Sequence, residues 1–361
     1  MRAIAMYLPQ FHTFPENDEW WGKGYTEWTA VKNAKPLFKK HVQPRIPMAY
    51  DYYDLSEEDG RTLKRQAKLA EQMGLYGFCF YNYYFKGKLL MEKPLEILLK
   101  HPEIKMRYCL CWANESWTRA WYDKQEEVLL EQTYGKEPDW EAHAEYLIRF
   151  FKDERYIKID NKPVLNIYRT FDISYLSDML NVLTKKTIDA GLEGLYVVGA
   201  HTAGEIDNRK ELMDAYYYFE PGYTLKHDMN LLHILSYDIG TGLRHAFNSI
   251  FKKEVLERRI PVEHIYKPII KREYAVNEFP GIFLRWDNTP RRGHKGLIYT
   301  GTTPAKFEKA LRALKNKVDG RENDFVYINA WNEWGEGAML EPDVQDGFEW
   351  IEAFKRVMDE Q

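Results

Sequence analysis

Eight short runs of apolar residues, rich in β-branched and aromatic side chains, recur along this chain with helix-like stretches between most of them. The runs cover residues 3–8, 76–81, 106–112, 163–168, 195–200, 215–219, 281–286 and 325–331. The helix-like stretches cover residues 56–73, 91–101, 140–152, 174–190, 303–318 and 345–358. Runs such as VYINAW are apolar at almost every position, which is typical of strands covered on both faces. This alternation predicts parallel strands joined by crossover helices.

An open doubly wound sheet and a (β/α)8 TIM barrel both fit such an alternation, but eight strands favour the barrel. No GxGxxG follows the first run, and no linker, repeat or low-complexity tract divides the chain. We therefore expect one α/β domain over residues 1–361, with inserts at about 9–55 and 220–280 as long βα loops on the catalytic face. The first insert shows no helix before Ser56, where SEED predicts a capping box.

Charge and cysteine usage narrow the class of partner. The formal net charge is only −4, so no global field indicates nucleic acid. Cys79, Cys109 and Cys111 lack CxxC spacing, which predicts reduced thiols in a cytoplasmic chain. The apolar run at the N-terminus is too short to form the apolar core of a signal peptide. No apolar stretch is long enough for a membrane span. Basic pairs such as Lys252–Lys253 and Lys271–Arg272 suggest a solvated or oligomer-facing surface, although the oligomeric state is not predicted.

Aromatic residues are abundant, at 15% of the chain with 26 Tyr and 11 Trp, and many stand among polar residues. A sugar ring stacks its C–H face on an aromatic ring and needs polar partners for its hydroxyls, so this content favours a carbohydrate ligand. Additional aromatic residues in the core are the alternative.

In a barrel, active-site side chains follow the carboxyl ends of the strands. The expected substrate-binding residues, read from those positions, are Tyr7, Gln10, His12, Glu27, Trp28, Tyr81, Asn82, Trp112, Asn114, Glu115, Tyr168, His201, Trp286, Asn332 and Trp334. Structural alternatives stay open for several of them. Glu115 could form an ion pair with Arg119, Glu27 could form a loop salt bridge, and either histidine could be an ordinary polar group. Arg285 and Asp287 could pair with each other.

The segment NAWNEWGEGAMLEPD, residues 329–343, carries the strongest signal. It places Glu333 and Glu336 three residues apart in a glycine-containing turn after the eighth run. Glycosidic cleavage commonly uses one carboxyl group as an acid and another as a base or nucleophile. Both are therefore the candidate catalytic residues, with the solvated first turn of a helix as the alternative for ExxE. Trp334 is expected to form a wall for a sugar ring. We predict no metal and no cofactor, because no HxH or HExxH spacing occurs.

This segment, together with AMYLPQFH, WWGKGYTEW, YGFCFYNYYF and LCWANESWTRAW, resembles the WbsX-type family of bacterial polysaccharide gene clusters. The same segment resembles the related glycoside hydrolase family 99 of endo-α-mannosidases. The resemblance implies a retaining barrel enzyme in which Glu333 acts as base on the sugar 2-hydroxyl and Glu336 protonates the leaving oxygen, through a 1,2-anhydro sugar. Gly335 departs from the second family, which tends to carry His there, so its mannosidase specificity does not carry over.

Three functions are consistent with these features: a retaining glycoside hydrolase, a glycosyltransferase of surface polysaccharide synthesis, and a carbohydrate-binding barrel without catalysis. No DxD motif and no glycine-rich phosphate loop occur, as a nucleotide-sugar enzyme would usually have. The sequence therefore favours hydrolysis of a polysaccharide or oligosaccharide.

Overall fold

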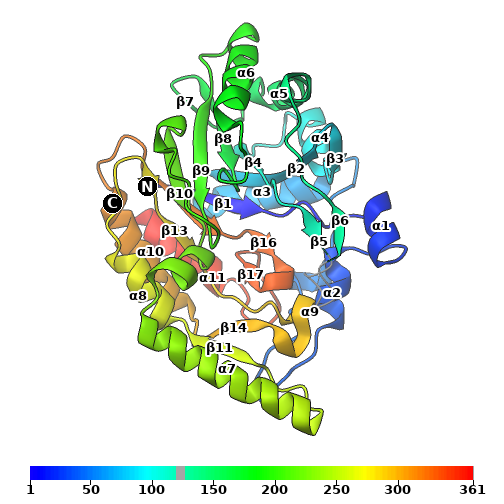
Figure 1. The fold of residues 1–361 in the computed structure, drawn as a ribbon, viewed down its shortest axis with the longest axis vertical. Helices are drawn as coiled ribbons and strands as arrows, with labels where there is room; N and C mark the ends of the chain where they lie inside the picture. The colour runs from blue at the N-terminus through cyan, green and yellow to red at the C-terminus, as the bar shows by residue number, and fades with distance from the viewer. Residues whose placement is uncertain (119–126, 361) are drawn as a thin grey trace.

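A barrel of parallel strands lies at the centre of the computed structural model, which describes residues 1–118 and 127–360 (Figure 1). In hydrogen-bonding order its described strands are β12 (Glu278–Phe279), β10 (Ala215–Tyr218), β9 (Tyr196–His201), β8 (Lys162–Ile167), β4 (Tyr108–Trp112), β2 (Gly77–Phe85), β1 (Arg2–Tyr7), β15 (Phe325–Asn329) and β13 (Gly281–Phe283). Pro280 separates β12, which pairs with β10, from β13, which pairs with β15. The two are halves of one strand, so the predicted eight-stranded barrel is confirmed.

The barrel strands are buried on both faces, as their near-continuous apolar sequences predict. Every residue of β4 and β15 is buried. The three free cysteines lie on β2 and β4 and are fully buried, with Cys79 opposite Cys109 in the register of the two strands. Tyr217 and Tyr327 stack with ring centres 4.4 Å apart. Side chains therefore fill the barrel, as in other barrels of this size.

Seven helices in the described ranges alternate with the strands. They are α3 (Arg61–Met73), α4 (Lys93–Lys100), α5 (Glu137–Phe151), α6 (Leu176–Asp189), α8 (Glu263–Lys271), α10 (Pro304–Val318) and α11 (Glu349–Asp359). In α10, Phe307, Leu311, Leu314 and Val318 are buried at helical spacing, and the hydroxyl of Thr303 accepts the amide of Lys306 at its start. Between β9 and β10 the chain forms only a short 3-10 turn, η3 (Lys210–Leu212).

The predicted start of the first helix at Ser56 is wrong. The amide and hydroxyl of Ser56 both donate to Oδ1 of Asp54, at 2.7 and 2.6 Å, so this serine stabilises a turn instead of a helix. Gly60 follows in the left-handed region, with φ of 61°, and α3 begins after it.

The first insert contains more helix than the sequence indicated, and the second is partly helical. In the first lie α1 (Pro15–Trp21), α2 (Glu27–Asn33) and the single turn η1 (Met48–Tyr50), although no helix was expected there. Helices of seven residues are too short for a periodic apolar pattern to stand out. The second insert holds the π-turn η4 (Thr224–Asp228), α7 (Leu231–Phe251), β11 (Arg258–Pro261) and α8. Arg272 is not solvated, because it forms ion pairs with Glu220 and Asp228.

Smaller elements occupy the loops and strand ends. They are β3 (Lys88–Leu90), β5 (Trp117–Thr118), β6 (Val128–Leu130), β7 (Lys158–Ile159), β14 (Leu297–Thr300), β16 (Asn332–Glu333), β17 (Ala338–Met339), α9 (Thr289–Arg292), η5 (Gly293–Lys295) and η6 (Trp334–Glu336). None of the described helices is both long and apolar enough to cross a lipid bilayer.

Candidate active site

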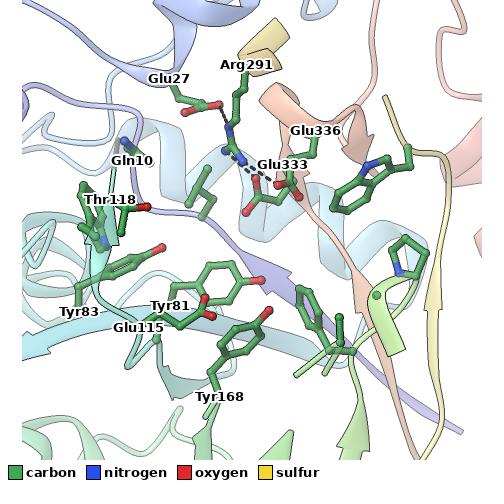
Figure 2. A pocket seen from close by; sticks show the side chains of 18 of the residues that line it. Gln10, Glu27, Tyr81, Tyr83, Glu115, Thr118, Tyr168, Arg291, Glu333 and Glu336 are labelled. Carbon is green, nitrogen blue, oxygen red and sulfur yellow. Dashed lines mark hydrogen bonds and ion pairs between the residues drawn. The ribbon is translucent and has the colours of Figure 1, made fainter. Parts of the chain in front are cut away.

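A cavity of about 300 Å³ opens at the carboxyl ends of the barrel strands, within the size range of small-ligand sites (Figure 2). Eight of the predicted site residues line this cavity, and they come from several strand ends. They are Gln10, Glu27, Tyr81, Glu115, Tyr168, Trp286, Glu333 and Glu336. The structure thus brings the two candidate catalytic acids together with six of the fifteen expected substrate-binding residues.

Arg291 of α9 connects three acids on one side of the cavity (Figure 2). Its Nε donates to Oε1 of Glu27 at 2.6 Å, and its two terminal nitrogens donate to Glu336 at 2.8 Å and Glu333 at 3.0 Å. Glu27 begins α2, while Glu333 and Glu336 follow β15 in β16 and η6. The guanidinium therefore fixes carboxylates from two distant parts of the chain in one geometry.

Burial controls the protonation of this cluster. Loss of solvent raises the pKa of Glu333 to about 8, with Arg291 opposing the shift and the charges of Glu336 and Glu27 adding to it. Burial also raises the pKa of Glu336, again against Arg291 and with a contribution from Glu27. Three carboxylates around one guanidinium would carry an excess of negative charge, so the Glu333–Glu336 pair keeps a proton near neutral pH.

Gly335 makes the convergence of Glu27 and Arg291 sterically possible. A Cβ atom at this position would lie 1.8 Å from Oε1 of Glu27 and 2.7 Å from Nε of Arg291. The departure from the His of family 99 therefore has a physical reason in this chain, because the Glu27–Arg291 pair occupies the space of a side chain.

Glu27 forms a salt bridge, as the structural alternative predicted, and one of its two carboxylate oxygens stays without a partner among the described residues. Its Oε1 accepts the Arg291 bond, as in the salt-bridge alternative, whereas its Oε2 is buried and has no hydrogen-bond partner among the described residues. An unsatisfied buried carboxylate oxygen is costly unless a ligand or water donates to it. Oε2 is thus available to accept from a ligand hydroxyl.

The opposite wall of the cavity is formed by Tyr81, Tyr83, Tyr168 and Glu115 (Figure 2). Burial raises the pKa of each of the three phenols well above the ordinary value, so they stay protonated and can donate hydrogen bonds. Glu115 contacts Arg169 at 3.2 Å. Arg119, the partner considered from the sequence, lies outside the described residues.

Nine predicted substrate-binding residues are not among those that line the cavity: Tyr7, His12, Trp28, Asn82, Trp112, Asn114, His201, Asn332 and Trp334. All are buried, and most have a protein partner. The Tyr7 hydroxyl donates to Gln66, Nε1 of Trp28 to the carbonyl of Tyr53, Nε1 of Trp112 to the carbonyl of Tyr84, and the Asn82 amide to Tyr146.

The remaining members of this group also stabilise the barrel end. Asn332 exchanges hydrogen bonds with the backbone of Leu8, and Asn114 does the same with Arg169. His201 stacks on Tyr216 with ring centres 4.5 Å apart, and burial lowers its pKa to about 4. His12 contacts the carbonyl of Thr13, and burial lowers its pKa.

Trp334 lies beneath the cavity, packed against Trp28, and does not form the expected wall. Its Nε1 donates to Oε2 of Glu341 at 2.7 Å. The same buried carboxylate accepts hydrogen bonds from Tyr53 at 2.7 Å, Gln66 at 2.6 Å and Trp331 at 3.1 Å. Glu341 therefore ties the segment that carries Glu333 and Glu336 to α3 and to the first insert.

Two features of the site were not predicted from the sequence: the position of Arg291, and the partners of Arg285 and Asp287. Arg291 was missed because it stands five residues beyond the predicted strand, in the sequence PRR; this basic pair, close after a strand end, was the available signal. Arg285 and Asp287 do not pair with each other. Arg285 contacts Asp343 and Asp346, whereas Asp287 contacts Nε2 of His41 at 2.7 Å.

The three acids of the cluster surround a guanidinium and are not arranged as metal ligands. Within residues 1–118 and 127–360, no group of three or more His, Cys, Asp or Glu side chains is placed to hold a metal ion.

The chain matches one family over nearly its whole length. The family model described as Glycosyltransferase WbsX matches residues 3–354. An uncharacterized protein WxcX from Xanthomonas campestris pv. campestris is 33% identical over 359 residues, which cover 98% of this chain and 49% of that protein. Its counterpart from strain B100 gives the same values. The chain thus spans about half the length of the curated relatives it matches.

Solved structures share the fold at low sequence identity. The GH99 endo-alpha-mannosidase from Bacteroides thetaiotaomicron matches with a TM-score of 0.54 and 10% identity, over 99% of each chain. A glycoside hydrolase-like protein matches with a TM-score of 0.58 and 14% identity, over 100% of this chain and 94% of that chain. At these identities the likeness establishes the barrel fold and nothing finer.

Proposed function

The chain belongs to the Glycosyltransferase WbsX family, and we propose that it is a retaining glycoside hydrolase that cleaves a bacterial polysaccharide or oligosaccharide. The single observation that carries this proposal is the pair of buried acids, Glu333 and Glu336, which share Arg291 at the wall of the cavity. Two carboxyl groups that hold one proton between them can supply the acid and the base that glycosidic cleavage requires.

In the proposed reaction, Glu333 removes the proton of the sugar 2-hydroxyl while the 2-oxygen attacks the anomeric carbon. Glu336 donates its proton to the departing glycosidic oxygen as the bond to that carbon breaks. Water then opens the 1,2-anhydro sugar, giving its proton to Glu336, and Glu333 returns its proton to the 2-oxygen. Each acid ends in its starting state, and two displacements retain the anomeric configuration.

The electrostatics of the cluster support a proton shared by the pair. In the ligand-free protein the two carboxyl groups hold one proton between them, because burial raises the pKa of both. The proposed reaction starts with that proton on Glu336. Arg291 contacts both carboxylates, so its charge stabilises whichever of them is ionised. A base with a raised pKa is also the stronger proton acceptor once it is ionised.

The remaining walls of the cavity suit a sugar. Trp286, Tyr81 and Tyr168 line it, and aromatic rings pack against the C–H face of a pyranose. The three protonated phenols and Oε2 of Glu27 provide donors and an acceptor for ring hydroxyls. We propose that all eight cavity-lining residues predicted from the sequence contact substrate or intermediate.

Digestion of a glycan panel without nucleotide sugar, read by mass spectrometry, tests the proposal. Wild type is expected to cleave a panel member, and Glu333→Gln and Glu336→Gln to lose about 100-fold or more in kcat while still binding that glycan. The control Glu352→Gln, on the exposed face of α11, keeps wild-type activity. Full activity in either cavity variant would overturn the assignment.

The leaving group separates the roles of the two acids. In an aryl glycoside whose phenol is strongly acidic, the phenolate departs without being protonated. Glu336→Gln is therefore expected to recover the rate of the first step on this substrate. Glu333→Gln is expected to stay inactive, because no base removes the 2-hydroxyl proton. The reverse pattern would exchange the two roles.

A glycosyltransferase is the second candidate, and the description of the family favours it. The same cavity could pass the sugar to another sugar's hydroxyl in place of water. No cleavage of the panel, together with transfer once activated donors are added, would establish this function.

A further inference from the structure

Helix α7 has its apolar face directed away from the protein. Eight Leu, Ile and Phe side chains of this helix are between 43% and 74% exposed. We call them the outer stripe: Leu231, Leu232, Leu235, Ile239, Leu243, Phe247, Ile250 and Phe251. Figure 1 shows α7 along the outer edge of the molecule, beside β11 and β14. A surface helix normally turns such a face toward the core.

The face of α7 that contacts the rest of the chain combines hydrogen-bonding groups with two partly buried side chains, Ile234 and Tyr237, that pack against the core. Asn248 is buried and exchanges hydrogen bonds with the backbone of Val255, at 2.7 and 2.9 Å. Nε of Arg244 donates to the carbonyl of Glu257 at 2.6 Å, and Tyr237 bonds His264. Hydrogen bonds and these two packed side chains thus attach α7 to the rest of the chain, while the outer stripe stays exposed.

The outer stripe is symmetric about Thr241. Each member has an apolar counterpart at the same distance on the other side: Leu231 with Phe251, Leu232 with Ile250, Leu235 with Phe247, and Ile239 with Leu243. Two copies of α7 that cross antiparallel about a two-fold axis at the level of Thr241 would therefore place apolar residues opposite apolar residues on both sides of the crossing point. Matching of a surface with itself is the property of a two-fold interface. A lipid surface requires no such symmetry.

The spacing and the glycines of α7 fit close helix packing. Leu231, Leu235, Ile239, Leu243, Phe247 and Phe251 follow one another at intervals of four, which is the ridge that packs into the grooves of a second helix in the commonest crossing geometry. Gly240 and Gly242 flank the midpoint. A Cβ at Gly242 would meet no atom within 4 Å, so packing within the chain does not explain this helix-destabilising residue. At a helix crossing, a missing side chain allows close approach.

We propose that the outer stripe of α7 is the interface of a homodimer, in which α7 packs antiparallel against α7 of a second copy of this chain. The dimer covers an apolar surface that an isolated copy would leave in water. It lies outside the residues that line the cavity and does not depend on the proposed reaction.

Sedimentation velocity on the full chain at micromolar concentration tests the interface. Wild type is expected at twice the 43.0 kDa mass of one chain. Leu243→Asp brings two like charges to the centre of the interface and is expected to weaken dimerisation about 100-fold or more. Lys253→Asp changes the charge by more but lies beyond the helix, and is expected to stay dimeric. A monomeric wild type, or a Leu243→Asp variant that dimerises normally, overturns the proposal.

Gly242→Leu distinguishes a packed helix pair from general apolar adhesion. The added side chain obstructs the crossing, so the dimer is expected to weaken, whereas binding to a lipid surface would be maintained or increased. Wild type and Gly242→Leu are therefore each mixed with phosphatidylcholine and phosphatidylglycerol vesicles and sedimented. Vesicle binding by a monomeric wild type, strengthened by Gly242→Leu, would replace the dimer with a membrane contact. Thermal melting followed by circular dichroism verifies that Leu243→Asp and Gly242→Leu fold.

Discussion

At the scale of single residues, the chemistry of the site depends on one cation among three acids. Arg291 contacts Glu27, Glu333 and Glu336, and all four side chains are at least largely buried. One positive charge cannot neutralise three buried negative charges, so a proton is retained on the pair that follows β15. The pair titrates as a unit, and its apparent pKa values belong to both acids together.

The pH dependence of catalysis follows from this retained proton. The proposed reaction needs the pair in its singly protonated form, and the pKa of Glu333 is raised to about 8. We therefore expect kcat/KM of wild type to fall as the pH rises through about 8, where the last proton is lost. The charge of Glu27 adds to the raised pKa, so Glu27→Gln is expected to move this fall to lower pH. Initial rates between pH 5 and 10 measure the pH at which kcat/KM falls in wild type and in Glu27→Gln. The same value in the two proteins would contradict the electrostatic coupling of Glu27 to the pair.

Gly335→Ala tests whether the acids must converge. Its Cβ would overlap Oε1 of Glu27 at 1.8 Å, and both Glu27 and Arg291 are held by further packing, so the ion pair has to separate. We expect a loss of about 100-fold or more in kcat/KM, as for removal of a positioning contact. Gly240→Ala in α7, whose Cβ would come no nearer than 3.4 Å to another residue, is the matched control. Equal activity in the two variants would show that the convergence is not needed.

At the scale of elements, the segment after β15 is held in place by hydrogen bonds to the buried carboxylate of Glu341. Its carboxylate accepts four hydrogen bonds, two of them from Trp331 and Trp334, which flank Glu333. A short segment with little regular structure thereby acquires a fixed position at the barrel end. Such support is what keeps catalytic groups within a fraction of an ångström of a productive geometry.

Glu341→Gln removes acceptor capacity without removing volume. The amide offers one oxygen, so donors that bonded the second oxygen lose their partner inside the protein. Each unsatisfied buried donor costs about 1–3 kcal/mol, and we expect the free energy of unfolding to decrease by about 2–4 kcal/mol. Urea unfolding followed by tryptophan fluorescence measures this value. Glu352→Gln, at the surface, should change it by less than about 0.5 kcal/mol; similar values for the two variants would contradict the role of Glu341.

Elements were predictable where their apolar pattern was long enough. The run at 325–331 predicted β15, and 303–318 predicted α10 to within a residue. The helices α1 and α2 were missed because seven residues carry too little periodicity. Ser56 misled for another reason: serine caps helices and stabilises turns by the same side-chain bonds, and the nearby Asp54 decides between them.

The site was predictable in part for a related reason. Consecutive strand residues point to opposite faces, so a polar or aromatic pair at a strand end sends one side chain toward the cavity and the other away from it. Tyr81 lines the cavity, whereas Asn82 bonds Tyr146 outside it. Nothing in the sequence identifies which member of such a pair faces inward. Arg291 was missed because the basic pair in PRR marks an unusual position in the loop, while the length of the loop does not reveal that its side chain returns to the cavity.

At the scale of the whole molecule, the alternation of strands and helices was sufficient to predict the barrel. Its closure required a detail that the sequence did not show. Pro280 interrupts the seventh strand, and β12 and β13 each pair with a different neighbour. Gly281 comes so close to β10 that a Cβ would lie 1.7 Å from the carbonyl oxygen of Tyr218. The closing strand is therefore bent around a point that admits no side chain.

The three buried thiols make it possible to measure how often this barrel opens. Cys79, Cys109 and Cys111 lie on neighbouring strands and are shielded from water on every side. Because all three thiols are fully buried, a thiol-reactive reagent labels them only after the protein has opened locally or globally around β2 and β4. The rate at which such a reagent labels the native protein therefore measures how often the interior of the barrel becomes accessible.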